Sequence, residues 1–315
     1  MGVFADLPRD MIAAALSAWG RGPMVACKPT DLGIENSNFF VSTENESGAI
    51  EEWVVTVMPA APSTAALEML ERLARAGLPV PAPVADLNGR TIGQVDGHPT
   101  LLAPRLPGTH PSAPSVTQCR AIGRFLAHMH RTCVDLDGPA HPRDAAWLEA
   151  GLAVFSRQLD YLSRTRLESA IGAIASAERR PDFARLPKGL VHGDLFRDNA
   201  LFIGTRLTGV IDFHHAARAP LAFDLAVVAM DWCTDAEGRL DAQRTRALLE
   251  AYASIRPLTQ EELWFWPLML VQACARFLVA RLHSPRKSPA EMIARLGDRL
   301  ERPMYLQPEG LVAED

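Results

Sequence analysis

The sequence predicts an α+β chain in which a small antiparallel-sheet lobe is followed by a larger, mainly helical lobe. Three observations support this prediction. Residues 1–103 alternate short β-branched and aromatic runs with tight turns, as strands do. Residues 104–114 contain four prolines, which is typical of a connection between lobes. Residues 115–315 contain repeated helix-start signals and long helical stretches. We therefore expect the lobes to meet at the 104–114 connection.

The first lobe is expected to begin with a helix over residues 8–19, which the Gly- and Pro-rich residues 20–23 terminate. Residues 39–42 and 53–57 are β-branched and aromatic runs. The polar residues 44–48 between them contain Asn, Ser and Gly, so these runs are predicted to form a hairpin.

The rest of the first lobe is predicted to contain a second helix and a second hairpin. The helix covers residues 64–76 and ends at Gly77, with a proline shortly beyond it. Short strands are expected over residues 90–95 and 99–103. Asp96-Gly97 joins them and is a strong signal for a two-residue hairpin turn.

The second lobe begins with Ser115 and Gln118, which have the spacing of a capping box and predict a helix running to about residue 133. A further helical stretch is expected over residues 145–179. Residues 190–213 differ, because short apolar strands there surround tight polar turns. Helices are predicted to resume near residues 224, 242 and 259, the last with a second capping box.

The composition is that of a folded protein. Hydrophobic residues make up 48% and charged residues 22% of the 315 residues, which excludes a disordered chain. The net charge of −5 and the pI of about 6.0 provide no basic field for nucleic acid. We therefore expect no nucleic-acid partner, and the sequence leaves the oligomeric state open.

The cysteines and the apolar runs indicate a cytoplasmic protein. The five cysteines are odd in number and form no C-x-x-C pair, which argues against a disulfide framework or a structural zinc site. The first residues lack the basic and apolar regions of a signal peptide. No apolar run approaches the roughly 18 residues of a membrane span, so no membrane partner is expected.

The chemistry is predicted from Asp194, Asn199 five residues later and Asp212 thirteen residues after that. Phosphoryl transfer to an alcohol requires a carboxylate that accepts the alcohol proton and oxygen ligands that hold Mg²⁺. The apolar residues 200–203 and 207–211 flank a Gly-Thr turn, so a hairpin would bring Asp212 back beside Asn199. The alternative is that these residues simply form turns, as Asp and Asn often do.

This segment resembles the aminoglycoside phosphotransferase and choline kinase superfamily, which has the protein-kinase-like two-lobed fold. The H-G-D-x-x-x-x-N pattern at 192–199 and the I-D-F at 211–213 carry that resemblance. The E-N-S-N-F at 35–39 and the D-W-C at 231–233 are most similar to the bacterial homoserine kinases of that fold. The resemblance implies an ATP-dependent phosphorylation of the hydroxyl of L-homoserine with Mg²⁺.

The resemblance also implies the roles of individual residues. Asp194 is expected to be the catalytic base, and Asn199 and Asp212 the magnesium ligands. His192 is expected to brace the loop through hydrogen bonds, and Asp224 to cap and anchor the following helix.

Residues 1–103 are expected to bind the nucleotide. By resemblance, the polar loop at 33–38 would lie over the phosphates, although it could also be an ordinary turn before a strand. Residues 53–58 contain no Lys, whereas many kinases have one on this strand, and Thr56 stands near its place. Residues 101–104 would form the hinge that meets adenine. The predicted nucleotide-binding residues are Gly33, Asn36, Ser37, Asn38, Thr56, Leu102 and Ala103.

Homoserine has a carboxylate and an ammonium group, so its site should offer an Arg and an acid. Arg276 and Arg281 are candidates for the carboxylate and Asp231 for the ammonium, although each could equally be an ordinary surface or packing charge. Trp232 is a further candidate for the substrate site. His214 and His215 follow Asp212, where the resembled group usually has aromatic and small residues. The alternatives are a related kinase of another amino alcohol, a sugar or an aminoglycoside, and an inactive nucleotide-binding protein.

Overall fold

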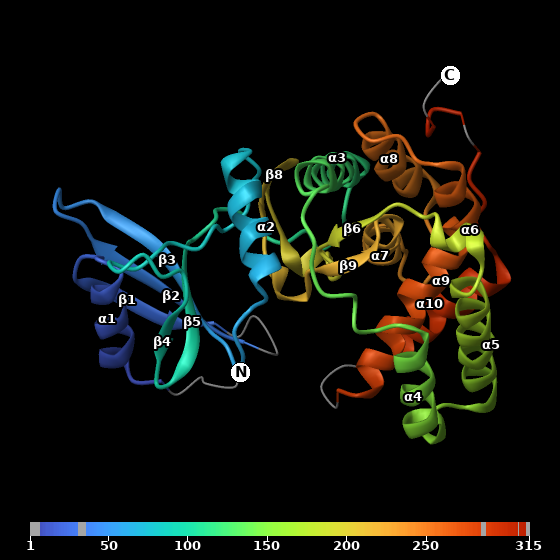
Figure 1. The fold of residues 1–315 in the computed structure, drawn as a ribbon, viewed down its shortest axis with the longest axis horizontal. Helices are drawn as coiled ribbons and strands as arrows, with labels where there is room; N and C mark the ends of the chain where they lie inside the picture. Colours follow the sequence, from blue (N-terminus) through green and yellow to red (C-terminus); the bar gives the residue numbers. More distant parts are fainter. Residues whose placement is uncertain (1–6, 31–35, 285–287, 308, 313–315) are drawn as a thin grey trace. The chain divides into compact units, whose positions relative to one another are not determined.

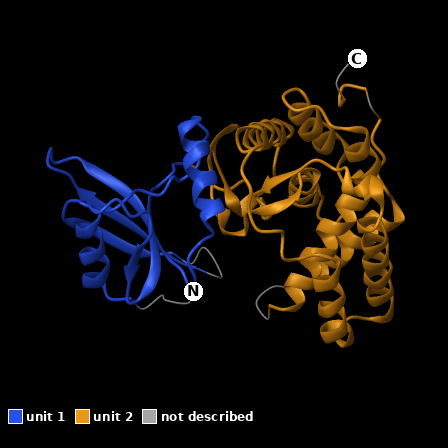
Figure 2. Cartoon of the chain, viewed as in Figure 1, with its two compact units in different colours: residues 1–107 blue, residues 108–315 orange. Residues whose placement is uncertain are grey.

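The computed structural model describes residues 7–30, 36–284, 288–307 and 309–312 (Figure 1). The chain divides into two compact units, Met1–Pro107 and Gly108–Asp315 (Figure 2). Each unit has its own core and is described by itself.

The smaller unit is built on a five-stranded antiparallel sheet with the strand order β1-β2-β3-β5-β4 (Figure 1). Its elements in chain order are α1 (Arg9–Ala18), β1 (Met24–Pro29), β2 (Ser37–Glu44), β3 (Ile50–Val57), α2 (Thr64–Arg75), β4 (Gly93–Val95) and β5 (His98–Pro104).

The core of the smaller unit lies on one face of this sheet. Phe39 of β2 is paired with Val55 of β3, which is paired with Leu102 of β5, and all three are buried. Ile12 and Leu16 of α1 belong to the same apolar cluster. Each of these side chains contributes roughly 1.5–3 kcal/mol by leaving water, so the alternation of the strands fixes which face meets α1.

The predicted hairpins and helices of this unit are confirmed. β2 pairs with β3, and β4 with β5. Asp96 and Gly97 both have positive φ, 51° and 76°, as a type I′ turn requires. Ser63 caps α2, and Gly77 follows it with a φ of 77°. Strand β1 was not predicted, because as a largely exposed edge strand it has no apolar alternation.

The larger unit is mainly helical and contains two short two-stranded sheets, β6-β9 and β7-β8. Its helices are α3 (Val116–Thr132), α4 (Ala145–Phe155), α5 (Tyr161–Glu178), α6 (Pro181–Ala184), α7 (Ala222–Trp232), α8 (Ala242–Ala253), α9 (Gln260–Leu282) and α10 (Ala290–Glu301). Its strands are β6 (Lys188–Val191), β7 (Ala200–Ile203), β8 (Arg206–Val210) and β9 (Ala217–Pro220).

The helix predicted over 145–179 is two helices. α4 gives way to a short 3₁₀ turn at Ser156–Gln158, and Asp160 then caps α5 by accepting the N–H of Ser163 at 2.9 Å. The two capping boxes that the sequence predicts, at Ser115 and Thr259, are both present. Helix α10 has no counterpart in the sequence-based prediction.

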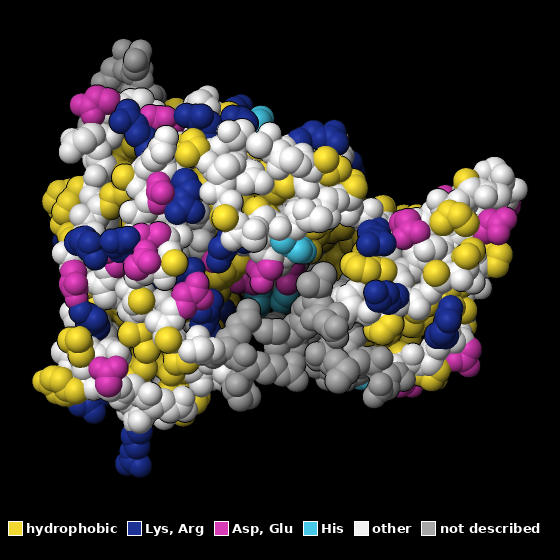
Figure 3. Space-filling view, turned by 180° about the vertical axis from the view of Figure 1, so that it is seen from behind, with side chains coloured by type: hydrophobic (Ala, Val, Ile, Leu, Met, Phe, Trp, Pro, Cys, Tyr) yellow, Lys and Arg dark blue, Asp and Glu magenta, His cyan; other side chains and the backbone are white. Residues whose placement is uncertain are grey.

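The core of the larger unit is formed around α7, whose residues are all buried, and α9, which packs against it (Figure 1). In the described part of the chain, α9 alone has the length and hydropathy of a membrane span, and 78% of its most apolar stretch is buried inside the structure. Burial of that kind is what a core helix shows. Charged side chains of both signs are mixed over the face shown in Figure 3.

Candidate active site

The predicted catalytic residues lie in and after the loop that joins β6 to β7, which we call the catalytic loop (residues 192–199). Gly193 has a φ of 77°, and a Cβ there would lie 3.1 Å from the carbonyl oxygen of His215. A side chain at this position would therefore meet both backbone strain and a close neighbour. The catalytic loop requires glycine at this position.

Asp224 anchors the catalytic loop from α7. Its Oδ2 accepts the N–H of His192 at 2.7 Å and its Oδ1 accepts the N–H of Gly193 at 2.8 Å. The Nε2 of His130 in α3 lies 3.1 Å from Oδ2 of Asp224, and the Nδ1 of the same ring lies 2.8 Å from the Tyr252 hydroxyl. The prediction that Asp224 caps its helix is wrong, because the carboxylate lies inside the first turn and turns back to the loop.

The protonation of Asp224 follows from these contacts. Burial raises the pKa of its carboxyl, but the hydrogen bonds that it accepts from His130 and from the Gly193 N–H, among its other contacts, outweigh that effect. The net pKa of Asp224 therefore lies below its ordinary value, and the carboxyl is ionised at neutral pH.

His192 spans the base of the loop as a neutral imidazole. Its Nδ1 lies 3.3 Å from the backbone N–H of Asp194, and its Nε2 lies 3.0 Å from the carbonyl oxygen of Ile211. Nδ1 accepts, so Nε2 carries the proton and donates. Burial lowers the pKa of His192, although the charge of Asp224 opposes this. These contacts join the catalytic loop to the segment that precedes Asp212.

Asn199 lies beside Asp194. Its Nδ2 donates to the backbone oxygen of Asp194 at 2.8 Å and lies 3.4 Å from the carboxylate Oδ2. Because the amide nitrogen is used in this way, Oδ1 of Asn199 faces the opposite side of the carboxamide. The residue is buried, so its orientation is held by packing as well as by the hydrogen bond.

The β7-β8 hairpin brings Asp212 back to this place, as the sequence predicts. Ala200 pairs with Val210, and the N–H of Ile211 donates to the backbone oxygen of Asn199 at 3.0 Å. The backbone of Asp212 adopts the left-handed helical conformation, with a φ of 69° and a ψ of 60°. Asp tolerates this conformation better than most residues, and such strain is often found at functional sites. The Nδ1 of His214 lies against its Oδ1.

The oxygen atoms of Asn199 and Asp212 are chemically suited to Mg²⁺. A carboxamide and a carboxylate are hard oxygen donors, and Mg²⁺ is usually held by one or two such ligands together with phosphates and water. Among the described residues, no group of three or more His, Cys, Asp or Glu side chains could form a closed metal cage. The donor set therefore fits a metal that is shared with a phosphate ligand.

The predicted nucleotide-binding residues lie in the smaller unit, apart from Gly33, which is outside the described residues. Asn38 is paired with Thr56 across β2 and β3, and the Thr56 hydroxyl donates to Asn38 Oδ1 at 2.7 Å. Both side chains are half-buried, on the sheet face opposite Phe39. Ser37 is buried and Asn36 is half-buried just before the strand.

Leu102 and Ala103 lie on β5. The Leu102 side chain is buried in the core, and its carbonyl oxygen accepts the N–H of Val84 at 2.8 Å. Ala103 is half-buried on the other face and paired with Val54. Of the two predicted hinge residues, Leu102 therefore packs into the core and Ala103 points away from it.

Asp231 forms ion pairs with two arginines, Arg197 and Arg295. Its Oδ2 accepts the backbone N–H of Arg197 at 2.9 Å and its Nε–H at 3.1 Å, and Arg295 of α10 lies 3.4 Å from Oδ1. Its side chain is only 5% exposed. Trp232 is buried beside it and donates from Nε1 to the backbone oxygen of Leu195 at 3.1 Å. Both residues thus hold the catalytic loop, and an ammonium ligand would have to compete with arginine for Asp231.

The two arginines of α9 that the sequence offers as carboxylate ligands have different surroundings. Arg281 donates to Glu291 of α10 at 2.7 Å. Arg276 is buried, and its Nε and Nη1 have no hydrogen-bond partner in the described part of the chain. Its guanidinium carbon lies 4.3 Å from the centre of the Phe223 ring.

His141 is a residue of this neighbourhood that sequence reasoning misses. It lies in the loop before α4, and its Nε2 would be 3.6 Å from a Cβ on Gly193. Burial, together with the charges of Arg276 and Arg143, lowers the pKa of His141 to about 3. No motif includes this residue, so only its place in the fold reveals it.

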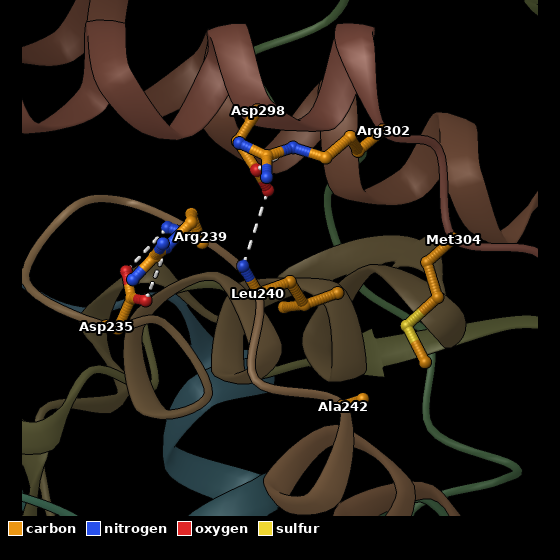
Figure 4. A pocket seen from close by; sticks show the side chains of 7 residues that line it. All are labelled: Asp235, Arg239, Leu240, Ala242, Asp298, Arg302 and Met304. Carbon is orange, nitrogen blue, oxygen red and sulfur yellow. Dashed lines mark hydrogen bonds and ion pairs between the residues drawn. The ribbon is translucent and has the colours of Figure 1, made fainter.

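A pocket of about 320 Å³ is lined by other residues than these, namely Asp235, Arg239, Leu240, Ala242, Asp298, Arg302 and Met304 (Figure 4). Its charged groups are paired with one another, Arg239 with Asp235 and Arg302 with Asp298. It therefore offers no free charge to a ligand.

Comparison with known sequences covers nearly the whole chain. Residues 26–258 match the model of the phosphotransferase enzyme family. The chain is 36% identical to a homoserine kinase of Pseudomonas aeruginosa (strain UCBPP-PA14), over 97% of this chain and 99% of that protein. It is also 36% identical to a homoserine kinase of Methylobacillus flagellatus, over 90% of this chain and 87% of that one.

Comparison with solved structures identifies the same fold. An amicoumacin kinase in complex with AMP-PNP, Ca²⁺ and its ligand has a TM-score of 0.70 at 14% identity and covers 94% of each chain. A microcompartment-associated aminopropanol kinase has a TM-score of 0.63 at 16% identity, covering 93% of this chain and 95% of that one. These similarities show the protein-kinase-like fold of the phosphotransferases.

Proposed function

Because this chain belongs to the phosphotransferase enzyme family, we propose that it transfers the γ-phosphoryl group of ATP to the hydroxyl of L-homoserine. The product is O-phospho-L-homoserine, an intermediate of threonine biosynthesis. The observation that carries the reaction class is the convergence of Asp194, Asn199 and Asp212 around one hairpin. The acceptor is supported by the homoserine kinases that match 97% of the chain.

In this proposal the chain positions the acceptor and removes its proton. The Asp194 carboxylate accepts the hydroxyl proton as the oxygen attacks phosphorus. Asp224 and His192 hold the backbone of the loop, so Asp194 needs little rearrangement to reach the hydroxyl. Asn199 Oδ1 and Asp212 would hold Mg²⁺, which supplies charge neutralisation for the phosphates when bound. The nucleotide-binding roles of the smaller unit stay predictions of the sequence.

The direct test is turnover with a panel of alcohols. ADP release is measured with Mg-ATP and L-homoserine, L-serine, L-threonine, choline or kanamycin. We expect turnover with L-homoserine at least about 30-fold above choline and kanamycin in kcat/KM, because these two lack a carboxylate and a buried charge that loses its partner costs about 2–5 kcal/mol. A preference for another alcohol of the panel would retain the reaction class and reject homoserine as the acceptor.

Removing a metal ligand is expected to change the metal requirement. Asp212→Asn should raise the Mg²⁺ concentration for half-maximal velocity by at least about 10-fold, because even groups behind a metal ligand cost 10- to 100-fold in affinity. The measurement is a Mg²⁺ titration of the velocity at saturating ATP, and chelation by EDTA should abolish turnover. Asp194→Asn is the comparison, because it should lower velocity at an unchanged Mg²⁺ midpoint. An unchanged midpoint in Asp212→Asn would remove Asp212 from the metal site.

A further inference from the structure

Arg276 is a buried cation with which no described residue forms an ion pair. It lies in α9, its residue surface is 4% exposed, and its Nε and Nη1 meet no hydrogen-bond acceptor in the described ranges. Burial lowers its pKa to about 10, although the charge of Glu178 acts in the opposite direction. It therefore stays protonated at neutral pH. A buried charge without hydrogen bonds is unfavourable for folding, so such groups are kept mostly where function uses them.

The acids nearest to Arg276 are engaged elsewhere. Glu178 accepts the side-chain amide of Gln272 at 3.2 Å. Asp144 caps α4 by accepting the N–H of Trp147 at 2.9 Å. Neither forms an ion pair with Arg276 in the described structure. The Nε and Nη1 donors of the guanidinium are therefore left without an acceptor among the described residues.

The Phe223 ring links Arg276 to the catalytic loop. The guanidinium of Arg276 stacks on Phe223, the residue directly before the loop anchor Asp224. His141 meets the same ring edge-on, with the ring centres 5.5 Å apart. The Nε2 of His141 in turn lies next to Gly193, the residue before Asp194. Arg276 and His141 thus contact one ring that adjoins the predicted base.

His141 presents a hydrogen-bond donor at this place. Its Nδ1 accepts the backbone N–H of Arg143 at 3.1 Å, so the proton of the neutral ring is on Nε2. Nε2 is also the atom that faces Gly193. A guanidinium and an imidazole N–H that contact the same ring are donors of the kind that a carboxylate, with its two oxygens, accepts.

We propose that Arg276, with His141 as a second donor, binds the carboxylate of the acceptor and selects amino-acid alcohols over simple amino alcohols. This inference rests on the proposed function, and it assigns the carboxylate to Arg276 and not to Arg281, whose guanidinium is paired with Glu291. Both donors contact the ring of Phe223.

The test compares L-homoserine with 3-aminopropan-1-ol, which is homoserine without its carboxylate. Wild-type protein should prefer homoserine strongly in kcat/KM. Arg276→Met should lower kcat/KM for homoserine by about 100-fold, since truncating one partner of a buried charge pair costs that much or more, and leave 3-aminopropan-1-ol unchanged. Arg246→Met, an exposed arginine of α8, is the matched control and should retain the preference. Loss of selectivity in Arg281→Met with Arg276→Met unaffected would overturn the assignment.

His141 is tested by two substitutions of different hydrogen-bonding capacity. His141→Gln places an amide donor near the Nε2 position and should retain most of the preference for homoserine. His141→Leu removes the donor and should reduce that preference by about 10-fold, the value of one hydrogen bond to a charged group. Equal selectivity in both variants and wild type would remove His141 from the site.

Thermal denaturation gives a readout that needs no turnover. L-Homoserine should raise the Tm of wild type, 3-aminopropan-1-ol should not, and Arg276→Met should lose the homoserine shift. The ligand-free Arg276→Met protein should melt above wild type, because an unpaired buried charge has been replaced by an apolar chain of similar length. A large fall in Tm together with equal losses for both alcohols would indicate a structural role and overturn the proposal.

The two proposals fail in different ways. If wild type phosphorylates neither alcohol but shows the Arg276-dependent homoserine shift, the carboxylate site stands and the proposed reaction fails. If wild type phosphorylates homoserine and Arg276→Met keeps both the shift and the selectivity, the reaction stands and the carboxylate site is rejected.

Discussion

Replacing Asp194 with Asn is expected to lower kcat for L-homoserine about 1,000-fold, the scale of a lost general base. Asn has the same shape but cannot take the hydroxyl proton. The loop should keep its geometry, because Asn199 is held mainly by the backbone oxygen of residue 194 and His192 by its backbone N–H. KM for ATP should therefore change little. The measurement is steady-state ADP release with each substrate varied in turn.

The matched control for this prediction is Asp198→Asn. Asp198 lies in the same loop but is exposed, so its substitution removes one negative charge without touching the cluster. Its kcat should stay within about twofold of wild type, as expected of a surface substitution. A kcat in Asp194→Asn that is likewise within a few-fold of wild type would mean that another group takes the proton.

The residues of the reaction could be predicted because they are close in sequence. Asp194, Asn199 and Asp212 lie in one loop and one hairpin, and the apolar runs between them fix the register that brings Asp212 back. Local patterns also gave the two hairpins of the smaller unit and both capping boxes of the larger one. Such features depend on interactions within a few residues, which a sequence displays directly.

The residues that support the site could not be predicted in the same way. The hydrogen-bond partners of Asp224 lie 31, 32 and 94 residues away in the sequence. Its position just before a predicted helix therefore suggests only a helix cap. Arg276 and Arg281 are alike in sequence, and α10 distinguishes them by pairing with Arg281 through Glu291. His141 belongs to no pattern and enters the site through the packing of its loop. These are tertiary effects, and local spacing carries no information about them.

Asp224→Asn is expected to have the largest effect on stability. The carboxylate is fully buried and accepts two backbone N–H groups and His130. An Asn must turn its NH₂ toward one of these donors, which leaves donors without an acceptor. Breaking a buried charged network of this kind costs about 3–5 kcal/mol. For a unit of this size the Tm should fall by about 6–20 °C.

Asp137→Asn is the control for this stability measurement. Asp137 lies in the same unit, its side chain is 84% exposed, and its ion pair with Arg218 is long at 3.6 Å. Exposed pairs of this kind contribute little, so its Tm should stay close to that of wild type. If the Tm of Asp224→Asn equals that of wild type, the catalytic loop is held by other contacts.

The pH dependence provides an independent check on Asp224, because the sign of its effect is fixed. Its pKa in the folded protein is lowered, so the ionised carboxyl contributes stability above its unfolded pKa of about 3.9, and that contribution is lost as pH falls through the folded pKa. The stability difference between wild type and Asp224→Asn should therefore be constant between about pH 5 and 8 and shrink below about pH 4. Denaturant unfolding of both proteins across this range measures it. A difference that instead grows as the pH falls would mean that Asp224 is protonated in the folded protein, and its hold on the catalytic loop would then be that of a neutral acid.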